Sequence, residues 1–258
     1  MSNEQKQEQQ SPSMHAITIA REYGSGGGEI ARRLAERLGW QLLDHQIVQR
    51  VAEKLGITED EAEAHDERVE SFATRLLESM QYALPQPPVV PDTYEGIIRP
   101  FDEKTYQQAL KQTILIATAL GQVVIVGRGA QVLLASHRDV LHVRIVAPLE
   151  ERVAYVMQRE NLNEAAARAR IAHKDQERRH AFKELHHCNS DDAHFYDLVI
   201  NTGVLDLQSA VDLILFALER KAQRLSLPTT ELGPGAGLTR YPGRPGDIRL
   251  QQSPNTVQ

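Results

Sequence analysis

Residues 17–39 read ITIAREYGSGGGEIARRLAERLG and decide the fold. An apolar run enters a glycine-rich turn, and apolar residues at helical spacing then continue to Gly39. A strand that passes through a glycine turn into a helix is typical of an α/β unit. Four glycines in five residues exceed what a tight turn needs, so we interpret this segment as a phosphate-binding loop rather than a plain turn. The segment consists of Gly24, Ser25, Gly26, Gly27 and Gly28.

The rest of the chain alternates short apolar runs with helical patterns. This alternation predicts a mostly parallel sheet with helices on both faces. Strands are expected at 15–20, 40–43, 123–126, 141–146 and 198–200, and helices at 30–38, 47–55, 58–83, 105–120, 149–160, 164–187 and 207–225.

Composition excludes several classes of protein. The 258 residues carry a net charge of -6 and only 5% aromatic side chains, which argues against binding of nucleic acid. A single cysteine, Cys188, allows no internal disulfide and suits the cytoplasm. No membrane-spanning stretch or signal peptide is recognisable, so no membrane partner is expected.

The loop departs from a complete P-loop motif. It continues Gly28-Glu29-Ile30, without the lysine and the hydroxyl residue that bind phosphate and magnesium. Glu29 would repel phosphate unless a metal intervenes. Arg21, Arg32 or Arg33 could supply the missing positive charge, although Arg32 and Arg33 suit a solvated surface equally well.

Three segments carry a resemblance to a known family: ITIAREYGSGGGEIARRLAERLGWQLLD, VVIVGRGA and YDLVINTG. Together they resemble the cytidylate kinase-like family over about residues 15–220. The resemblance implies a P-loop NTPase-like sheet with a helical lid. It also implies transfer of the γ-phosphate of ATP, with Mg²⁺, to a nucleoside monophosphate, first of all CMP or dCMP.

The same resemblance implies roles for individual residues. Residues 24–28 would bind the ATP phosphates, Asp44 would face the acceptor nucleotide, and Arg50 would contact its phosphate. Arg128 would bind the same phosphate. The catalytic set implied in this way is Arg21, Arg128, Arg178 and Arg179, the last two from the lid.

Other interpretations of these residues stay open. Asp44 could cap the next helix, Arg50 could lie on a solvated face, and Arg128 could pair with a surface carboxylate. The histidines at 173, 180 and 187 are spaced too widely for a ligand pair on a helix, so no metal-binding residues are predicted.

Two positions differ from cytidylate kinases proper. Gly27 stands where these kinases have the loop lysine, and Gly129 stands where they have an acidic residue after Gly-Arg. A nucleotide- or anion-sensing module that acts through a protein partner is therefore the second hypothesis. We expect Gly27→Lys to raise turnover if the missing lysine alone limits the chemistry. We expect Gly26→Val to abolish phosphate binding and spare the fold.

The predicted domain organisation follows from the same patterns. A kinase-like domain spans 14–225, with a monophosphate-side insert at 57–110 and a lid at 160–195. A disordered tail is expected at 1–13 and a flexible Pro/Gly-rich tail at 226–258.

Overall fold

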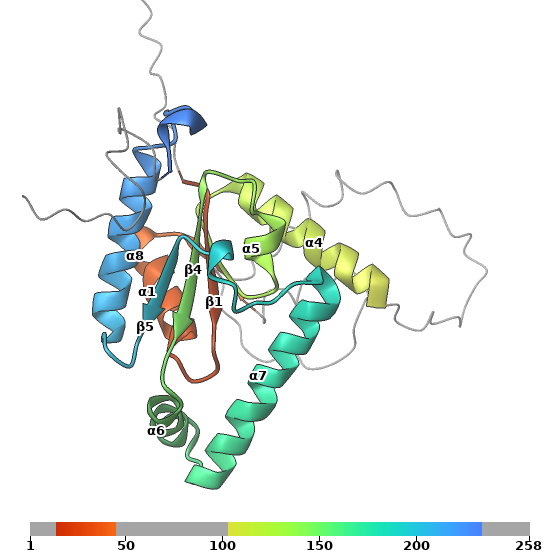
Figure 1. The fold of residues 1–258 in the computed structure, drawn as a ribbon, viewed down its shortest axis with the longest axis vertical. Coiled ribbons are helices and arrows are strands. Elements are labelled where there is room, and N and C mark those ends of the chain that lie inside the picture. Colours follow the sequence, from red (N-terminus) through yellow and green to blue (C-terminus); the bar gives the residue numbers. More distant parts are fainter. Residues whose placement is uncertain (1–13, 45–102, 234–258) are drawn as a thin grey trace, which may run out of the picture.

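The computed structural model describes residues 14–44 and 103–233 (Figure 1). In these residues, five parallel strands form one sheet in the order β2-β3-β1-β4-β5. This confirms the predicted parallel α/β fold. The strands are β1 (Ala16–Arg21), β2 (Gln41–Leu43), β3 (Val123–Val126), β4 (Val140–Val146) and β5 (Leu198–Asn201).

The helices begin and end close to the predicted positions. The Asn163 side chain caps one helix by accepting from the Ala166 N–H, and Asp206 caps another by accepting from the Ser209 N–H. The short helix α5 was not predicted. The helices are α1 (Gly27–Leu38), α4 (Glu103–Leu120), α5 (Ala130–Leu133), α6 (Leu149–Glu160), α7 (Glu164–His186) and α8 (Leu207–Ala222).

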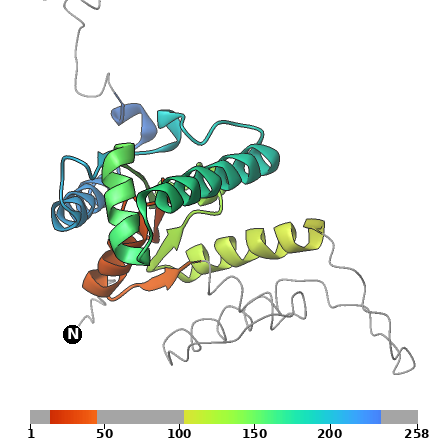
Figure 2. The ribbon, with the colours of Figure 1, turned by 90° about the horizontal axis from the view of Figure 1, so that it is seen from below.

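Helices cover both faces of the sheet. Side chains alternate along β1, so Ile17 and Ile19 pack in a core with α1 and α8, whereas Ala16 belongs to the core with α4 and α5. Strand β3 is fully buried, as its all-apolar sequence predicts. In Figure 2, α8 lies on one side of the molecule, and α4 and α7 extend from the other.

The strand order predicts a ligand-binding position at the carboxyl ends of the neighbouring strands β1 and β3. Strands β1 and β3 are neighbours, but the chain leaves β1 through α1 toward β2 and leaves β3 through α5 toward β4. The two connections run in opposite directions on opposite faces. In open α/β sheets, ligands bind at the carboxyl ends of strands where the connections diverge in this way.

Several predicted segments lie outside the described residues. These are the tail at 1–13, the helices at 47–55 and 58–83, most of the insert at 57–110, and residues 234–258. The start of the predicted C-terminal tail is structured: Thr229–Glu231 form a 3₁₀ turn, and Arg138 donates to the Leu227 carbonyl. No helix within the described ranges is long and apolar enough to span a membrane.

Candidate phosphate-binding site

The glycine-rich loop joins β1 to α1. It lies at the carboxyl end of β1, where the connections from β1 and β3 diverge. Gly24 and Gly26 have φ angles of 82° and 77°, which disfavour any side chain. A β-carbon at Gly24 would lie 2.9 Å from Val156 Cγ2, and one at Gly26 would lie 2.5 Å from Leu207 Cδ2. At Gly24 the Arg152 carbonyl is also only 3.0 Å away, so the fold itself favours this glycine. At Gly26 the φ angle disfavours a side chain and Leu207 would have to move, so we now expect Gly26→Val to cost stability as well as phosphate binding.

The first turn of α1 is the open part of the loop. Gly28 is exposed, and a β-carbon added there would meet no atom within 4 Å. Among the described residues no side chain caps this helix, in contrast to α7 and α8, so its first N–H groups have no side-chain acceptor there. Such a helix end favours an anion.

Glu29 lies in the same turn but is paired within the helix. Its carboxylate accepts from Arg32 Nη2 and Arg33 Nε, each at 2.8 Å, and these bonds lower its pKa to about 2. Arg32 and Arg33 are thus paired with Glu29, which leaves Arg21, the last residue of β1, as the candidate for the missing positive charge.

Three arginines converge next to the loop. The pKa of Arg21 is lowered by burial and by the like charges of Arg178 and Arg128, while Asp44 opposes the shift. Burial also lowers the pKa of Arg178. Arg128 follows Gly127 at the end of β3, and Arg178 Nη1 donates to the Arg21 carbonyl at 3.1 Å. A cluster of cations of this kind binds phosphate favourably.

Helix α7, the predicted lid, is docked on the loop through a residue that sequence reasoning missed. Asp175 is only 9% exposed; its Oδ1 accepts from the Tyr23 N–H at 2.8 Å, and its Oδ2 accepts from Arg152 Nη1 at 2.6 Å. One turn further along, the Arg178 guanidinium lies 5.3 Å from the centre of the Tyr23 ring. Asp175 stands in a charged run that is typical of a solvated helix, so only its contacts reveal this role.

Three other residues predicted for the site are not seen to contribute to it. Arg179 is exposed, unlike its neighbour Arg178. The Ser25 hydroxyl donates to the Glu22 carbonyl at 2.9 Å and is buried in the fold rather than turned to a ligand. Arg50 lies outside the described residues.

Packing also explains why Gly129 stands where cytidylate kinases have an acidic residue after Gly-Arg. A β-carbon at Gly129 would lie 1.8 Å from His186 Nε2, so the imidazole at the end of α7 fills the space of a side chain at this position. Gly129 also has a φ angle of 66°. An acidic residue at 129 is therefore incompatible with this position of His186.

The described residues do not fit a dedicated magnesium site. Gly28 stands at the position of the usual hydroxyl ligand, and the Glu29 carboxylate is bound to two arginines. Within 14–44 and 103–233, no group of three or more His, Cys, Asp or Glu side chains could hold a metal.

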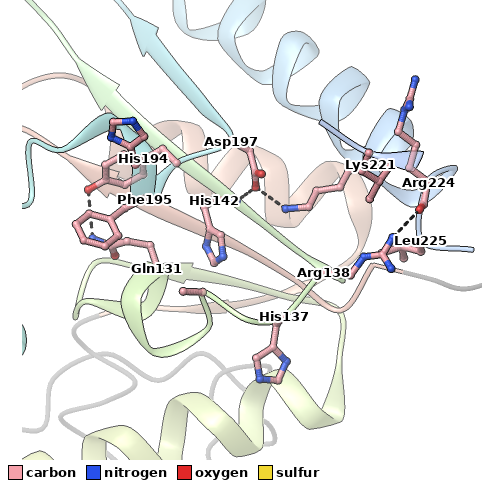
Figure 3. A pocket seen from close by; sticks show the side chains of 13 residues that line it. Gln131, His137, Arg138, His142, His194, Phe195, Asp197, Lys221, Arg224 and Leu225 are labelled. Carbon is pink, nitrogen blue, oxygen red and sulfur yellow. Dashed lines mark hydrogen bonds and ion pairs between the residues drawn. The ribbon is translucent and has the colours of Figure 1, made fainter. Parts of the chain in front are cut away.

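A hollow of about 280 Å³ lies at the opposite, amino-terminal edge of β4 and β5 (Figure 3). Two of its basic side chains, Lys221 and Arg138, have partners in the protein. Lys221 Nζ donates to Asp197 at 2.6 Å, and Arg138 donates to the Arg224 and Leu227 carbonyls at 3.0 and 2.7 Å. These bonds attach the end of α8 and the segment after it to the sheet, so we assign this hollow a structural role.

Comparisons with known proteins bear on the site as a whole. Residues 16–204 match the model of the cytidylate kinase-like family. A cytidylate kinase from Ignicoccus hospitalis is 24% identical over 78% of this chain and 97% of its own length. One from Methanocaldococcus jannaschii is 29% identical over 38% of this chain and 57% of its own.

Two further matches show less about this chain, one because it covers a small part of the relative and one because its identity is low. A uronate isomerase from Corynebacterium glutamicum is 37% identical over 98 residues, and the chain spans 19% of that protein's length. A solved structure of an uncharacterized protein from Eubacterium ventriosum superimposes with a TM-score of 0.52 at 20% identity, covering 80% of this chain and 98% of that one. This likeness shows a shared fold.

Proposed function

Because the chain belongs to the cytidylate kinase-like family, we propose that it transfers the γ-phosphoryl group of ATP to a nucleoside monophosphate. CMP and dCMP are the first candidates for the acceptor. ATP, Mg²⁺ carried by the nucleotide and a cytoplasmic location belong to the same proposal. The family and the fold support a kinase-like activity. The identity of the acceptor substrate is what must be tested.

The observation that carries the proposal is the convergence of Arg21, Arg128 and Arg178. Arg178 donates to the Arg21 carbonyl at 3.1 Å, and Arg21 lies against Gly27 at the start of α1 and against Gly127, the residue before Arg128. These side chains come from the end of β1, the end of β3 and the lid helix. Phosphoryl transfer asks a protein mainly to position the phosphates and to compensate their charge. Arginines gathered at a helix amino terminus meet both needs.

The proposed chemistry assigns each group a simple part. An oxygen of the acceptor phosphate attacks the γ-phosphorus, the bond to the β–γ bridging oxygen breaks, and ADP leaves with that electron pair. Arg128 and Arg178 would hold the acceptor and the transferred phosphate, and neither would exchange a proton. Asp44 would face the acceptor nucleoside.

A coupled kinase assay over a panel of nucleoside monophosphates, together with ATP calorimetry, tests the proposal. Turnover with a pyrimidine monophosphate would support it. If neither ATP binding nor turnover with any nucleoside monophosphate is found, the proposal is wrong.

A nucleotide- or anion-sensing module is the second candidate. The observation that favours it is the absence of a lysine at Gly27 and of a hydroxyl at Gly28. ATP binding without turnover in the same measurements would favour this candidate over the kinase.

Arg178 and Arg179 of α7 differ in exposure, which gives a matched test of their proposed roles. Arg178→Ala removes a partly buried guanidinium that contacts the Arg21 carbonyl and the Tyr23 ring. We expect kcat/KM to fall by roughly tenfold, the low end for a lost hydrogen bond to a charged group. Arg179→Ala, one residue along and exposed, should remain near wild type. Equal losses in the two variants would contradict the placement of Arg178 in the site.

A further inference from the structure

The spacing of the loop allows each position to be compared with the P-loop pattern G-x-x-x-x-G-K-[ST]. With Gly26 as the second glycine, the lysine position is 27 and the first glycine position is 21. This chain has the reverse: a glycine at 27 and an arginine at 21. We propose that Arg21 supplies the cation that a loop lysine supplies elsewhere, so that the charge has moved from the helix to the end of β1. The inference rests on the proposed phosphotransferase function.

Steric exclusion between the two positions supports this exchange. A β-carbon at Gly27 would lie 2.7 Å from Arg21 Cβ and 3.2 Å from Arg21 Cγ. Both atoms of Arg21 are close to its backbone, which is fixed in β1 opposite Ile145. The Cβ atom cannot swing away without movement of the backbone, so the Arg21 side chain and any side chain at position 27 exclude each other.

A second glycine makes room for the other end of the same side chain. A β-carbon at Gly127 would lie 2.1 Å from Arg21 Nη1. Gly127 also has a φ angle of 76°, at the end of β3 directly before Arg128. Two glycines far apart in the sequence thus leave space for one arginine, which a solvated surface arginine would not need.

The charges around Arg21 favour the binding of an anion, because positive charges outnumber negative ones there. Its neighbours Arg128 and Arg178 carry the same charge, and Asp44 is the opposing carboxylate. An arginine grips phosphate oxygens with two N–H groups in a fixed plane, whereas a lysine acts as a point charge. Arg21 would therefore orient the phosphates as well as compensate their charge, and it would keep its proton throughout the transfer.

This arrangement changes what Gly27→Lys should do. With Arg21 present, the lysine collides with Arg21 Cβ, so we expect a lower melting temperature and weaker ATP binding instead of the gain in turnover that the sequence suggested. Arg21→Gly should fold but lose at least roughly 100-fold in kcat. The double variant Arg21→Gly/Gly27→Lys restores the order of the P-loop pattern. It should recover at least about tenfold in kcat over Arg21→Gly, together with the melting temperature lost in Gly27→Lys.

A matched control isolates the steric part. In Arg21→Ala/Gly27→Lys, the β-carbon at position 21 remains 2.7 Å from that at position 27, so this variant should not recover. The measurements are melting temperature, MgATP affinity by calorimetry, and kcat with CMP.

The outcomes separate this inference from the proposed function. The exchange is overturned if Gly27→Lys keeps the wild-type melting temperature and ATP affinity. It is also overturned if the double variant binds ATP no better than Arg21→Gly. If the wild type binds no ATP and has no turnover, the proposed function fails and the role of Arg21 as the phosphate cation fails with it. The melting temperatures would still show whether positions 21 and 27 exclude each other.

Discussion

Gly28→Asp is expected to weaken ATP binding by about 100-fold or more while leaving the fold at least as stable as in the wild type. Position 28 is exposed, and an added β-carbon meets no atom within 4 Å. A carboxylate in the first turn of a helix stabilises it by roughly 0.3–1 kcal/mol. The same carboxylate would repel a phosphate at the helix end. At a separation of about 5 Å and an effective dielectric constant of about 20, the repulsion is about 3 kcal/mol.

Gly28→Asn is the matched control, because it has nearly the same size and shape without the charge. It should bind ATP within about threefold of the wild type, and the gap between the two variants should shrink in high salt. Calorimetry gives the affinities, and thermal unfolding gives the stabilities. Equal ATP affinities in Gly28→Asp and Gly28→Asn would place the phosphates elsewhere and remove the basis of the phosphate-loop assignment.

The strands and long helices could be predicted from the sequence because their signals are local. The all-apolar run Val123–Val126 reads as a strand buried on both faces, and residues such as Asp206 mark where helices begin. Helix α5 gave no such signal, since it has four residues and follows a glycine in the left-handed region. Its position depends on the connection from β3 to β4.

The site was only partly predictable, because a glycine in the sequence does not show which neighbouring side chain occupies the space beside it. The glycine count suggested a ligand, yet Gly24 is required by Val156 and Arg152, and Gly27 by Arg21. These contacts join residues that are remote in the sequence or that lie across a turn. The ends of β1 and β3 could be recognised locally, which is why the sequence alone points to Arg21 and Arg128. Asp175 could not be recognised, because burial alone distinguishes it from the other charged residues of α7.

Asp175→Ala is expected to lower the free energy of unfolding by about 3–5 kcal/mol, the range for breaking a buried ion pair by removing one partner. The side chains of Asp175 and Arg152 are 12% and 11% exposed, and their pairing distance is 2.6 Å. Without the carboxylate, Arg152 keeps the Tyr23 and Ala147 carbonyls at 3.2 and 3.1 Å and the Glu22 carboxylate at 3.7 Å but loses its closer counter-ion, so the loss should lie at the low end of this range. The Tyr23 N–H loses its acceptor as well. ATP affinity should fall in the same variant, because Tyr23 directly precedes the glycines of the loop.

Two further variants show whether the loss comes from this contact. Asp175→Asn keeps an oxygen for the Tyr23 N–H and removes only the charge, so its loss should lie between those of the alanine variant and the wild type. Glu177→Ala removes a carboxylate from the same helix that is 48% exposed and paired with Lys174 and His173. Its effect should stay within about 1 kcal/mol, as for other exposed ion pairs. Urea unfolding measures all three. If Asp175→Ala and Glu177→Ala lose the same small amount, the buried pair does not hold α7 to the loop, and α7 must be positioned by its apolar contacts with α6.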